Sequence, residues 1–152
     1  MSSGAILVVN GPNLNLLGVR EPEIYGCDTL ETAEKLCKDA AAQHGFTVDF
    51  KQSNSEAELI EWIQKARNTY SAIVINAAAF THTSIAILDA LTLTNLPIFE
   101  VHLSNIFARE KFRNYSYISS IAKSVVCGYG IDGYVYAVQN AIKCVISSEK
   151  VV

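Results

Sequence analysis

Residues that can move protons or hold anions occur in three separate parts of this sequence. The first part is the segment NGPNLNLLGVREPEIYG, in which Arg20 and Tyr25 stand five residues apart. A cation beside a phenol stabilises the phenolate and lowers the pKa of the tyrosine from about 10, so this pair could supply a tyrosinate base. Taken alone, Tyr25 would more often be a loop aromatic that packs on the next helix.

The second part is the segment EVHLSN. Glu100, His102 and Ser104 alternate along a predicted strand, so their side chains point to the same face of the sheet. A carboxylate beside an imidazole can orient it as a general acid or base, although a lone histidine on an apolar strand is by default a core residue. Arg109 and Arg113 follow one helical turn apart and could bind an anion.

The third part combines amide, imidazole and hydroxyl groups. Asn76 ends a predicted strand, and the sequence THTS, residues 81–84, opens a predicted helix. Its hydroxyls could cap that helix, or could act with free N–H groups and His82 to bind a carboxylate. Asp89 lies in an apolar helical pattern, where a carboxylate is costly unless it is paired, and could meet a partner across a subunit interface.

The elements that must position these groups alternate between strands and helices. Runs rich in Val, Ile and Phe predict strands at 5–10, 46–52, 72–77, 97–104 and 124–130. Several runs are apolar throughout, as expected of strands that are covered on both faces. Apolar residues at helical spacing predict helices at 30–44, 55–70, 84–93 and from 132 onwards.

Particular residues mark the ends and inner faces of the predicted helices. Asp28 and Glu31 are spaced like a capping box before the first helix, and Gly45 ends it. Ser55 and Glu58 begin the second helix in the same way. The predicted inner stripe of the last helix is Val135, Val138, Ile142 and Val145 or Ile146.

This alternation predicts an α/β fold, with one domain over residues 1–152 and a five-stranded parallel sheet covered by helices on both faces. The flavodoxin-like strand order 2-1-3-4-5 is the usual solution for five strands. Ligands of such sheets bind beyond the carboxyl ends of the strands, where the order reverses. The three segments that can transfer protons or bind anions should therefore meet at one edge of the sheet, beside strands 1 and 3.

Charge and composition exclude several classes of function. The net charge of −3 and the pI of about 5.6 provide no positive field for a nucleic acid or an anionic membrane. The sequence contains neither an apolar stretch of about 18 residues nor a basic leader with an apolar core, which predicts a soluble, cytoplasmic protein. Cysteines without a CxxC pair favour buried, reduced thiols.

Several ligand classes fit the predicted loops poorly. GYGIDG matches the dinucleotide-binding pattern, but it follows the last strand, with no later strand to supply the ribose-binding acid. The loop after strand 1 lacks a Ser- and Thr-rich turn for a flavin phosphate, and Asn10 and Asn76 stand where a phosphoryl-accepting receiver needs aspartates. Glu100, His102 and His82 could in principle bind a metal ion, but the neighbouring arginines disfavour a divalent cation.

Five segments together resemble type II 3-dehydroquinate dehydratases. In order they are NGPNLNLLGVREPEIYG, QSNSEAELIEWI, NAAAFTHTSIAILDA, EVHLSN and AREKFRNYSYIS, and they span nearly the whole chain. The resemblance implies a flavodoxin-like fold and the dehydration of 3-dehydroquinate to 3-dehydroshikimate through an enolate, without cofactor or metal. It leaves open whether the enzyme serves the shikimate pathway, for aromatic amino acid biosynthesis, or quinate catabolism.

The resemblance also assigns roles in proton transfer. Tyr25 would remove the C2 proton of the substrate, and Arg20 would keep its phenol ionised. Asn13 would position a water or a donor at the developing oxyanion. His102 would protonate the departing hydroxyl and would be held by Glu100. The long loop after strand 1 would close over the substrate as a lid.

Substrate binding and quaternary structure follow from the same resemblance. The substrate carboxylate and hydroxyls would be bound by Asn76, His82, Leu103, Ser104 and Arg113. Arg109 matches a supporting arginine, and Asp89 matches an acid that reaches the substrate region from a neighbouring subunit of a homo-oligomer, a dodecamer built from trimers. A catalytically silent flavodoxin-like protein that keeps the pocket for binding or as a scaffold is the alternative.

Overall fold

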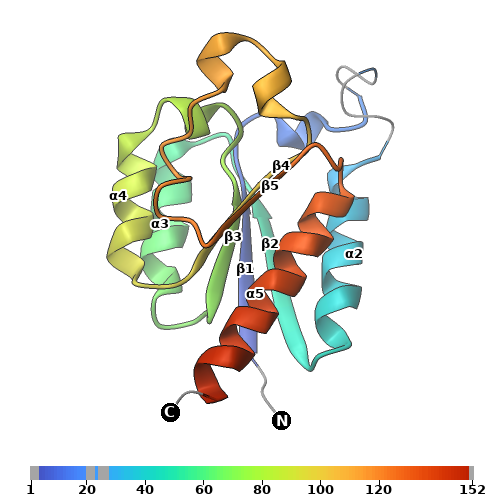
Figure 1. Cartoon of the computed structure of the whole chain (residues 1–152), viewed down its shortest axis with the longest axis vertical. Coiled ribbons are helices and arrows are strands. Elements are labelled where there is room, and N and C mark those ends of the chain that lie inside the picture. Colours follow the sequence, from blue (N-terminus) through green and yellow to red (C-terminus); the bar gives the residue numbers. More distant parts are fainter. Residues whose placement is uncertain (1–3, 20–22, 24–27, 151–152) are drawn as a thin grey trace.

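The computed structural model describes residues 4–19, 23 and 28–150 and contains one five-stranded parallel sheet (Figure 1). The strand order β2-β1-β3-β4-β5 confirms the predicted flavodoxin-like topology. The strands are β1 (Gly4–Asn10), β2 (Phe46–Gln52), β3 (Ala72–Asn76), β4 (Ile98–His102) and β5 (Ser124–Cys127). The last two are shorter than predicted, and β5 ends where Gly128 and Gly130 adopt positive φ angles of 90° and 60°.

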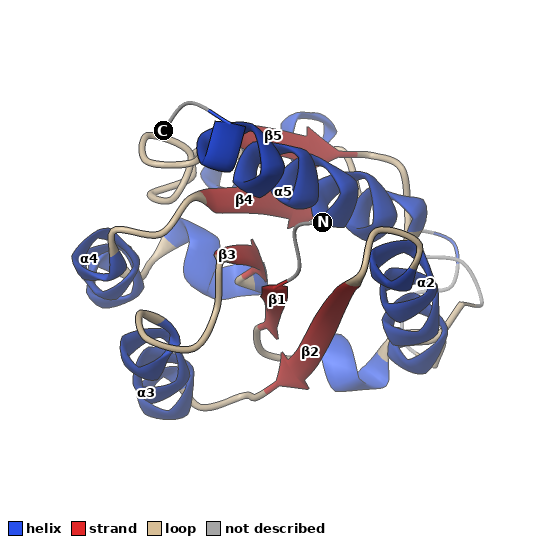
Figure 2. Ribbon diagram, turned by 90° about the horizontal axis from the view of Figure 1, so that it is seen from below, coloured by secondary structure: helices blue, strands red, loops and turns tan. Residues whose placement is uncertain are grey.

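Among the described residues, four α-helices cover the sheet on both faces. They are α2 (Leu30–Ala42), α3 (Glu56–Ala66), α4 (Ile85–Thr94) and α5 (Asp132–Lys150). Figure 2 shows α2 and α5 on one face of the sheet and α3 and α4 on the other. None of the described helices is long and apolar enough to cross a membrane.

The position of β1 between two layers of helices explains why its sequence is so apolar. Ile6 and Val8 belong to the core beneath α2 and α5, whereas Leu7 and Val9 belong to the core beneath α3 and α4. All four side chains are fully buried. Since successive residues of a strand point to opposite faces, a strand between two helical layers needs an apolar residue at every position.

Hydroxyl side chains cap the helices that follow β2 and β3, as predicted for Ser55 and as one of the two alternatives for residues 81–84. Ser55 Oγ accepts from the Glu58 N–H at 3.2 Å, and Ser84 Oγ accepts from the Ile87 N–H at 2.9 Å. The predicted capping box of α2 is wrong. Thr29 caps this helix instead of Asp28, because the extended backbone lies one residue later. Each cap satisfies an amide that has no partner within its helix.

The inner stripe predicted for α5 is also partly wrong. Tyr134 is fully buried, whereas its neighbour Val135 is only partly buried. A buried phenol requires a hydrogen-bond partner, and Tyr134 finds one at each of two strand ends. The predicted Val138 and Ile142 are buried.

The cysteines in the described part of the chain are free thiols. Cys37 is fully buried in the core, and Cys127 and Cys144 are partly buried. Burial raises the pKa of Cys37 to about 12, so this side chain stays a protonated thiol at neutral pH. Of the described cysteines only Cys37 is buried as predicted, the reduced state stays a prediction, and Cys27 lies outside the described residues.

The loops after β1 and β3 approach each other closely at the carboxyl edge of the sheet. The Gly11 N–H donates to the Asn76 carbonyl at 2.8 Å. A Cβ atom on Gly11 would lie 2.2 Å from the Ala77 carbonyl oxygen, which is far inside van der Waals contact. Only glycine allows this approach, and it brings the two loops of the predicted site together.

Candidate active site

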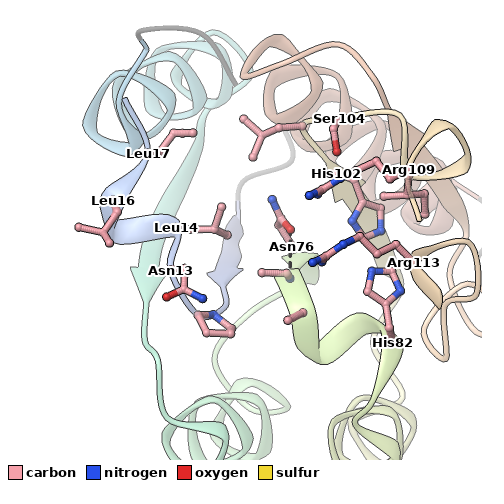
Figure 3. A pocket seen from close by; sticks show the side chains of 15 residues that line it. Asn13, Leu14, Leu16, Leu17, Asn76, His82, His102, Ser104, Arg109 and Arg113 are labelled. Atoms are coloured by element: carbon pink, nitrogen blue, oxygen red, sulfur yellow. Dashed lines mark hydrogen bonds between the residues drawn. The ribbon is translucent and has the colours of Figure 1, made fainter. Parts of the chain in front are cut away.

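A pocket opens at the carboxyl ends of β1, β3 and β4, at the edge where ligand binding was predicted. Figure 3 shows the residues after β1 on one side of it and the imidazole and guanidinium groups on the other. It is lined by Pro12, Asn13, Leu14, Leu16, Leu17, Asn76, Ala78, Ala79, His82, His102, Leu103, Ser104, Ile106, Arg109 and Arg113. Segments that are far apart in the sequence therefore line a single pocket.

A buried carboxylate holds the imidazole of His102. Nε2 of His102 lies 2.5 Å from Oε2 of Glu100, and the two residues are 4% and 0% exposed. Burial alone would raise the pKa of Glu100, but hydrogen bonds from His102, Ser119 and Ser116 lower it below its usual value. Glu100 is therefore ionised at neutral pH, so Nε2 carries the proton that they share. The other nitrogen, Nδ1, is left to exchange a proton or form a hydrogen bond with a ligand in the pocket.

A second imidazole, that of His82, lies at the end of the 3-10 helix η2 (Ala78–His82). Its ring stacks near that of His102, with 6.4 Å between centroids and 20° between planes. Burial lowers the pKa of His82 and outweighs the hydrogen bond to the Tyr115 carbonyl, which raises it. Nδ1 lies 2.7 Å from the Tyr115 carbonyl oxygen, so the neutral ring donates through Nδ1 and keeps Nε2 as an acceptor.

Two arginines supply positive charge to the pocket. Both line it, and Nε of Arg113 donates to Oε2 of Glu110 at 2.8 Å. The Arg109 Nε lies 3.9 Å from the other oxygen of Glu110. The hydrogen bond from Arg113 lowers the pKa of Glu110, so this carboxylate stays ionised between the two guanidinium groups. The Nη groups of Arg113, which do not take part in this hydrogen bond, could bind an anionic ligand.

Asn13 is held in an uncommon backbone conformation on the opposite wall. Its φ angle is 71°, in the left-handed region that asparagine tolerates better than most residues. The Asn13 N–H donates to Oδ1 of Asn54 at 2.9 Å, and Nε2 of Gln52 donates to the same oxygen and to the Gly11 carbonyl. The last residue of β2 and Asn54 in the β2–α3 connection thus fix the start of the loop after β1.

The amide of Asn76 belongs to a buried network at the centre of the sheet edge. Its Nδ2 donates to the Tyr134 hydroxyl at 3.0 Å, and this hydroxyl donates to Oδ1 of Asn10 at 2.6 Å. Oδ1 of Asn76 accepts from the Ala78 N–H at 3.2 Å. One Nδ2 hydrogen of Asn76 remains for a ligand, and the orientation of the amide is fixed.

The predicted site residues differ in where the structure places them. Nine of them gather at the pocket: Asn13, Asn76, His82, His102, Leu103, Ser104, Arg109 and Arg113 line it, and Glu100 lies behind His102. Asp89 lies apart from them, exposed on α4, and does not line the pocket. Arg20 and Tyr25 lie outside the described residues.

Five polar residues that support the site were missed from the sequence, and one of them is Tyr134, which holds the Asn76 amide. Ser116 and Ser119 bind Glu100, and Gln52 and Asn54 bind the loop that carries Asn13. The Ser-x-x-Ser spacing was visible, but nothing local links it to a carboxylate 16 and 19 residues earlier. Among the described residues, no three His, Cys, Asp or Glu side chains converge as a metal site would require.

Comparisons with known proteins place nearly the whole chain in one family. A family model described as class II dehydroquinase matches residues 4–142. A 3-dehydroquinate dehydratase of Streptomyces coelicolor is 58% identical over 141 residues, which cover 92% of this chain and 90% of that protein. One from Azorhizobium caulinodans is 53% identical, with 90% and 92% covered. The crystal structure of a type II dehydroquinase from Propionibacterium acnes superposes with a TM-score of 0.85 at 41% identity, covering 91% of this chain and 96% of that one.

Proposed function

This chain belongs to the class II dehydroquinase family, and we propose that it dehydrates 3-dehydroquinate with a tyrosinate base and an imidazolium acid. It is an enzyme, a 3-dehydroquinate dehydratase. The finer mechanism is carried by one observation, the buried Glu100–His102 pair at the wall of a pocket that also presents two arginines.

The reaction divides into two proton transfers. Tyr25, as the phenolate, takes the proton from C2, next to the substrate carbonyl, and the C–H electrons form an enolate. Collapse of the enolate then expels the hydroxyl on the adjacent carbon, which leaves as water after it takes a proton from His102. Arg20 stabilises the phenolate, and Asn13 stabilises the oxyanion of the enolate through a water or its own amide.

The described geometry supports the acid half of this scheme. Because Nε2 of His102 is engaged by Glu100, proton delivery passes through Nδ1, and the carboxylate stabilises the imidazolium that forms before each turnover. Ser104 and Leu103 follow directly on the same chain segment and line the pocket beside His102. A substrate hydroxyl held there would lie within reach of the acid.

The charge distribution supports binding of a small hydroxylated carboxylate. Arg113 is proposed to bind the substrate carboxylate, with Arg109 in a supporting role. His82 is neutral at pH 7 because burial lowers its pKa, so it would accept a hydroxyl hydrogen bond through Nε2. The free Nδ2 hydrogen of Asn76 would donate to another substrate oxygen. We include no cofactor or metal in this mechanism.

We propose that the enzyme works as a homo-oligomer built from trimers. Ile85, Asp89 and Leu93 are spaced four residues apart on α4, and all three are exposed, the two apolar side chains by 55% and 69%. This spacing puts them on one helix face. An exposed apolar face that carries a carboxylate at its centre suits a subunit contact through which Asp89 reaches the neighbouring pocket.

Turnover of 3-dehydroquinate by the purified protein tests the proposed function. The product contains a C=C bond conjugated with its carbonyl, so its ultraviolet absorbance reports the reaction directly. We expect steady turnover by the wild type. Tyr25→Phe and Arg20→Ala should each lose at least about 100-fold in kcat, because they remove the base or its ionising partner.

Tyr136→Phe provides the matched control, since this tyrosine is on α5 and is 43% exposed. It should turn over substrate like the wild type. A folded wild-type protein that binds 3-dehydroquinate without forming product would instead support the silent binding protein. Turnover by Tyr25→Phe at the wild-type rate would remove Tyr25 from the mechanism.

A further inference from the structure

Residues 115–119, which we call the site strap, contact both elements that carry an imidazole. The strap follows the short 3-10 helix η4 (Lys111–Arg113), whose last residue lines the pocket. Its Tyr117 N–H donates to the Thr81 carbonyl at 3.0 Å, one residue before His82. This bond attaches the strap to η2 through its backbone. Two of its side chains, Ser116 and Ser119, bind Glu100 on β4.

The first of these side chains, Ser116, has a hydroxyl whose orientation is determined by the strap itself. Its Oγ accepts from the Ile118 N–H at 3.1 Å and from the Ser119 N–H at 3.2 Å. With both lone pairs occupied, the hydroxyl hydrogen is left to donate to Oε2 of Glu100, 2.8 Å away. Ser116 is thus a fixed donor to the carboxylate.

Ser119 holds the other oxygen of the same carboxylate. Its Oγ donates to Oε1 of Glu100 at 2.6 Å. The terminal torsion of a glutamate is broad, so a carboxylate held through one oxygen can turn about its axis. With His102 and Ser116 on Oε2 and Ser119 on Oε1, the plane of the Glu100 carboxylate is fixed.

The plane of this carboxylate determines the direction of the hydrogen bond to Nε2 of His102. That bond in turn orients the ring and aims Nδ1 at the pocket. The strap also holds the second ring, because the Tyr115 carbonyl accepts from Nδ1 of His82 at 2.7 Å. One segment of five residues therefore determines the orientation and tautomer of both imidazoles.

We propose that Ser116 and Ser119 are positioning residues for proton transfer by His102, acting through the Glu100 carboxylate. The proposal rests on the proposed function, in which His102 protonates the departing hydroxyl. Neither serine lines the pocket, so their effect should fall on the chemical step and not on substrate binding.

The surroundings of Glu100 allow a pH measurement to report on the two serines. Its register partners on the flanking strands are Ile75 and Val125, both apolar. The titratable groups that face it are His102 on its own strand and His82 on η2. Loss of either serine removes a donor to the charged form of Glu100, so the acidic limb of the kcat profile should move to higher pH.

Serine-to-alanine variants test the proposal in the same turnover assay. Ser116→Ala and Ser119→Ala should each lower kcat by about tenfold or more, with KM within about twofold of the wild type. Ser119→Thr keeps the hydroxyl and should restore most of the lost kcat. Ser120→Ala is the matched control, because Ser120 is the exposed neighbour of Ser119. If the serine variants turn over substrate like Ser120→Ala, the proposal is wrong.

A double-mutant cycle separates positioning from a general structural role. In a Glu100→Gln background, Ser119→Ala should cost less than about twofold more in kcat, because its effect has already been lost. A further loss equal to that in the wild type would show that Ser119 acts elsewhere. Melting temperatures of all variants identify any loss of kcat that comes from unfolding.

Proton NMR of the resting enzyme gives a readout that needs no turnover. The short bond between His102 and Glu100 should give a far-downfield N–H resonance, assigned by its loss in Glu100→Gln. Ser116→Ala and Ser119→Ala should shift or broaden this resonance, and Ser120→Ala should not. A changed resonance without wild-type turnover would defeat the proposed function alone. Normal turnover with unchanged resonances in the serine variants would defeat the positioning role alone.

Discussion

At the scale of single residues, the buried carboxylate of Glu100 is the most constrained group in the described site. An ionised carboxylate with no exposure is tolerated only when donors replace its lost hydration. Glu100 receives three such donors, one imidazole and two hydroxyls. The fold consequently holds a charge against the imidazole in a place that water does not reach.

This constraint predicts how stability depends on pH. The folded state lowers the pKa of Glu100 below its usual 4.5, because the hydrogen bonds outweigh burial. Its contribution to the unfolding free energy is therefore complete above about pH 4.5 and is lost as the pH falls through the lower, folded-state pKa. Urea unfolding at several pH values between 3 and 7 should show a steeper acid-side decline for the wild type than for Glu100→Gln.

The glutamine variant should be less stable than the wild type at pH 7, because it replaces a charged acceptor of three hydrogen bonds. Its curve should approach that of the wild type at low pH, where Glu100 is protonated. Parallel curves for the two proteins across the whole range would show that Glu100 titrates alike in the folded and unfolded states.

At the scale of elements, the site depends on the contact between the loops after β1 and β3. Gly11 touches the Ala77 carbonyl, and the next residue, Ala78, has a φ of 53° that is held by its hydrogen bond to Asn76. An alanine in the left-handed region is strained by about 1–2 kcal/mol. The close approach at Gly11 and the strained backbone at Ala78 together bring Asn13 and Asn76 to the same pocket.

Two complementary substitutions test this contact. Gly11→Ala should lower the unfolding free energy by about 1–3 kcal/mol and reduce kcat, because the new methyl group pushes the loops apart. Ala78→Gly should leave stability unchanged or raise it by about 1 kcal/mol, because glycine adopts the positive φ without strain. Chemical denaturation measures both. Equal destabilisation by the two variants would contradict this account.

At the scale of the whole molecule, the exposed face of α4 predicts assembly. Leu93→Glu should lower the mass of the particle measured by size-exclusion chromatography with light scattering, because it places a charge in an apolar contact. Gln64→Glu adds the same charge on the exposed face of α3 and should leave the mass unchanged. Asp89→Asn should keep the oligomer and weaken catalysis or substrate binding. A monomeric wild type would contradict the assembly.

The sequence predicts this molecule well wherever the signal is local and poorly where it is not. The strands and helices follow from short apolar patterns, and their alternation predicts a parallel sheet. The order 2-1-3-4-5, the usual solution for five such strands, is confirmed. Tyr134 was missed because the hydrogen-bond partners that allow its hydroxyl to be buried are amides 58 and 124 residues away in the sequence. Ser116 and Ser119 were missed for the same reason, since their partner lies on a different element. His102 could be predicted because its partner is two residues away on the same strand.

The Tyr134 network also has a consequence for the order in which the chain is synthesised. The amides of Asn10 and Asn76 have no phenol to bind until α5 has left the ribosome, although β1 and β3 are made long before. A nascent chain that ends before Asp132 would leave Oδ1 of Asn10 and Nδ2 of Asn76 without this phenol, beneath an uncovered apolar face of the sheet. Catalytic competence is therefore expected to arise late in translation, when the last helix docks, and not when the residues of the pocket have been made.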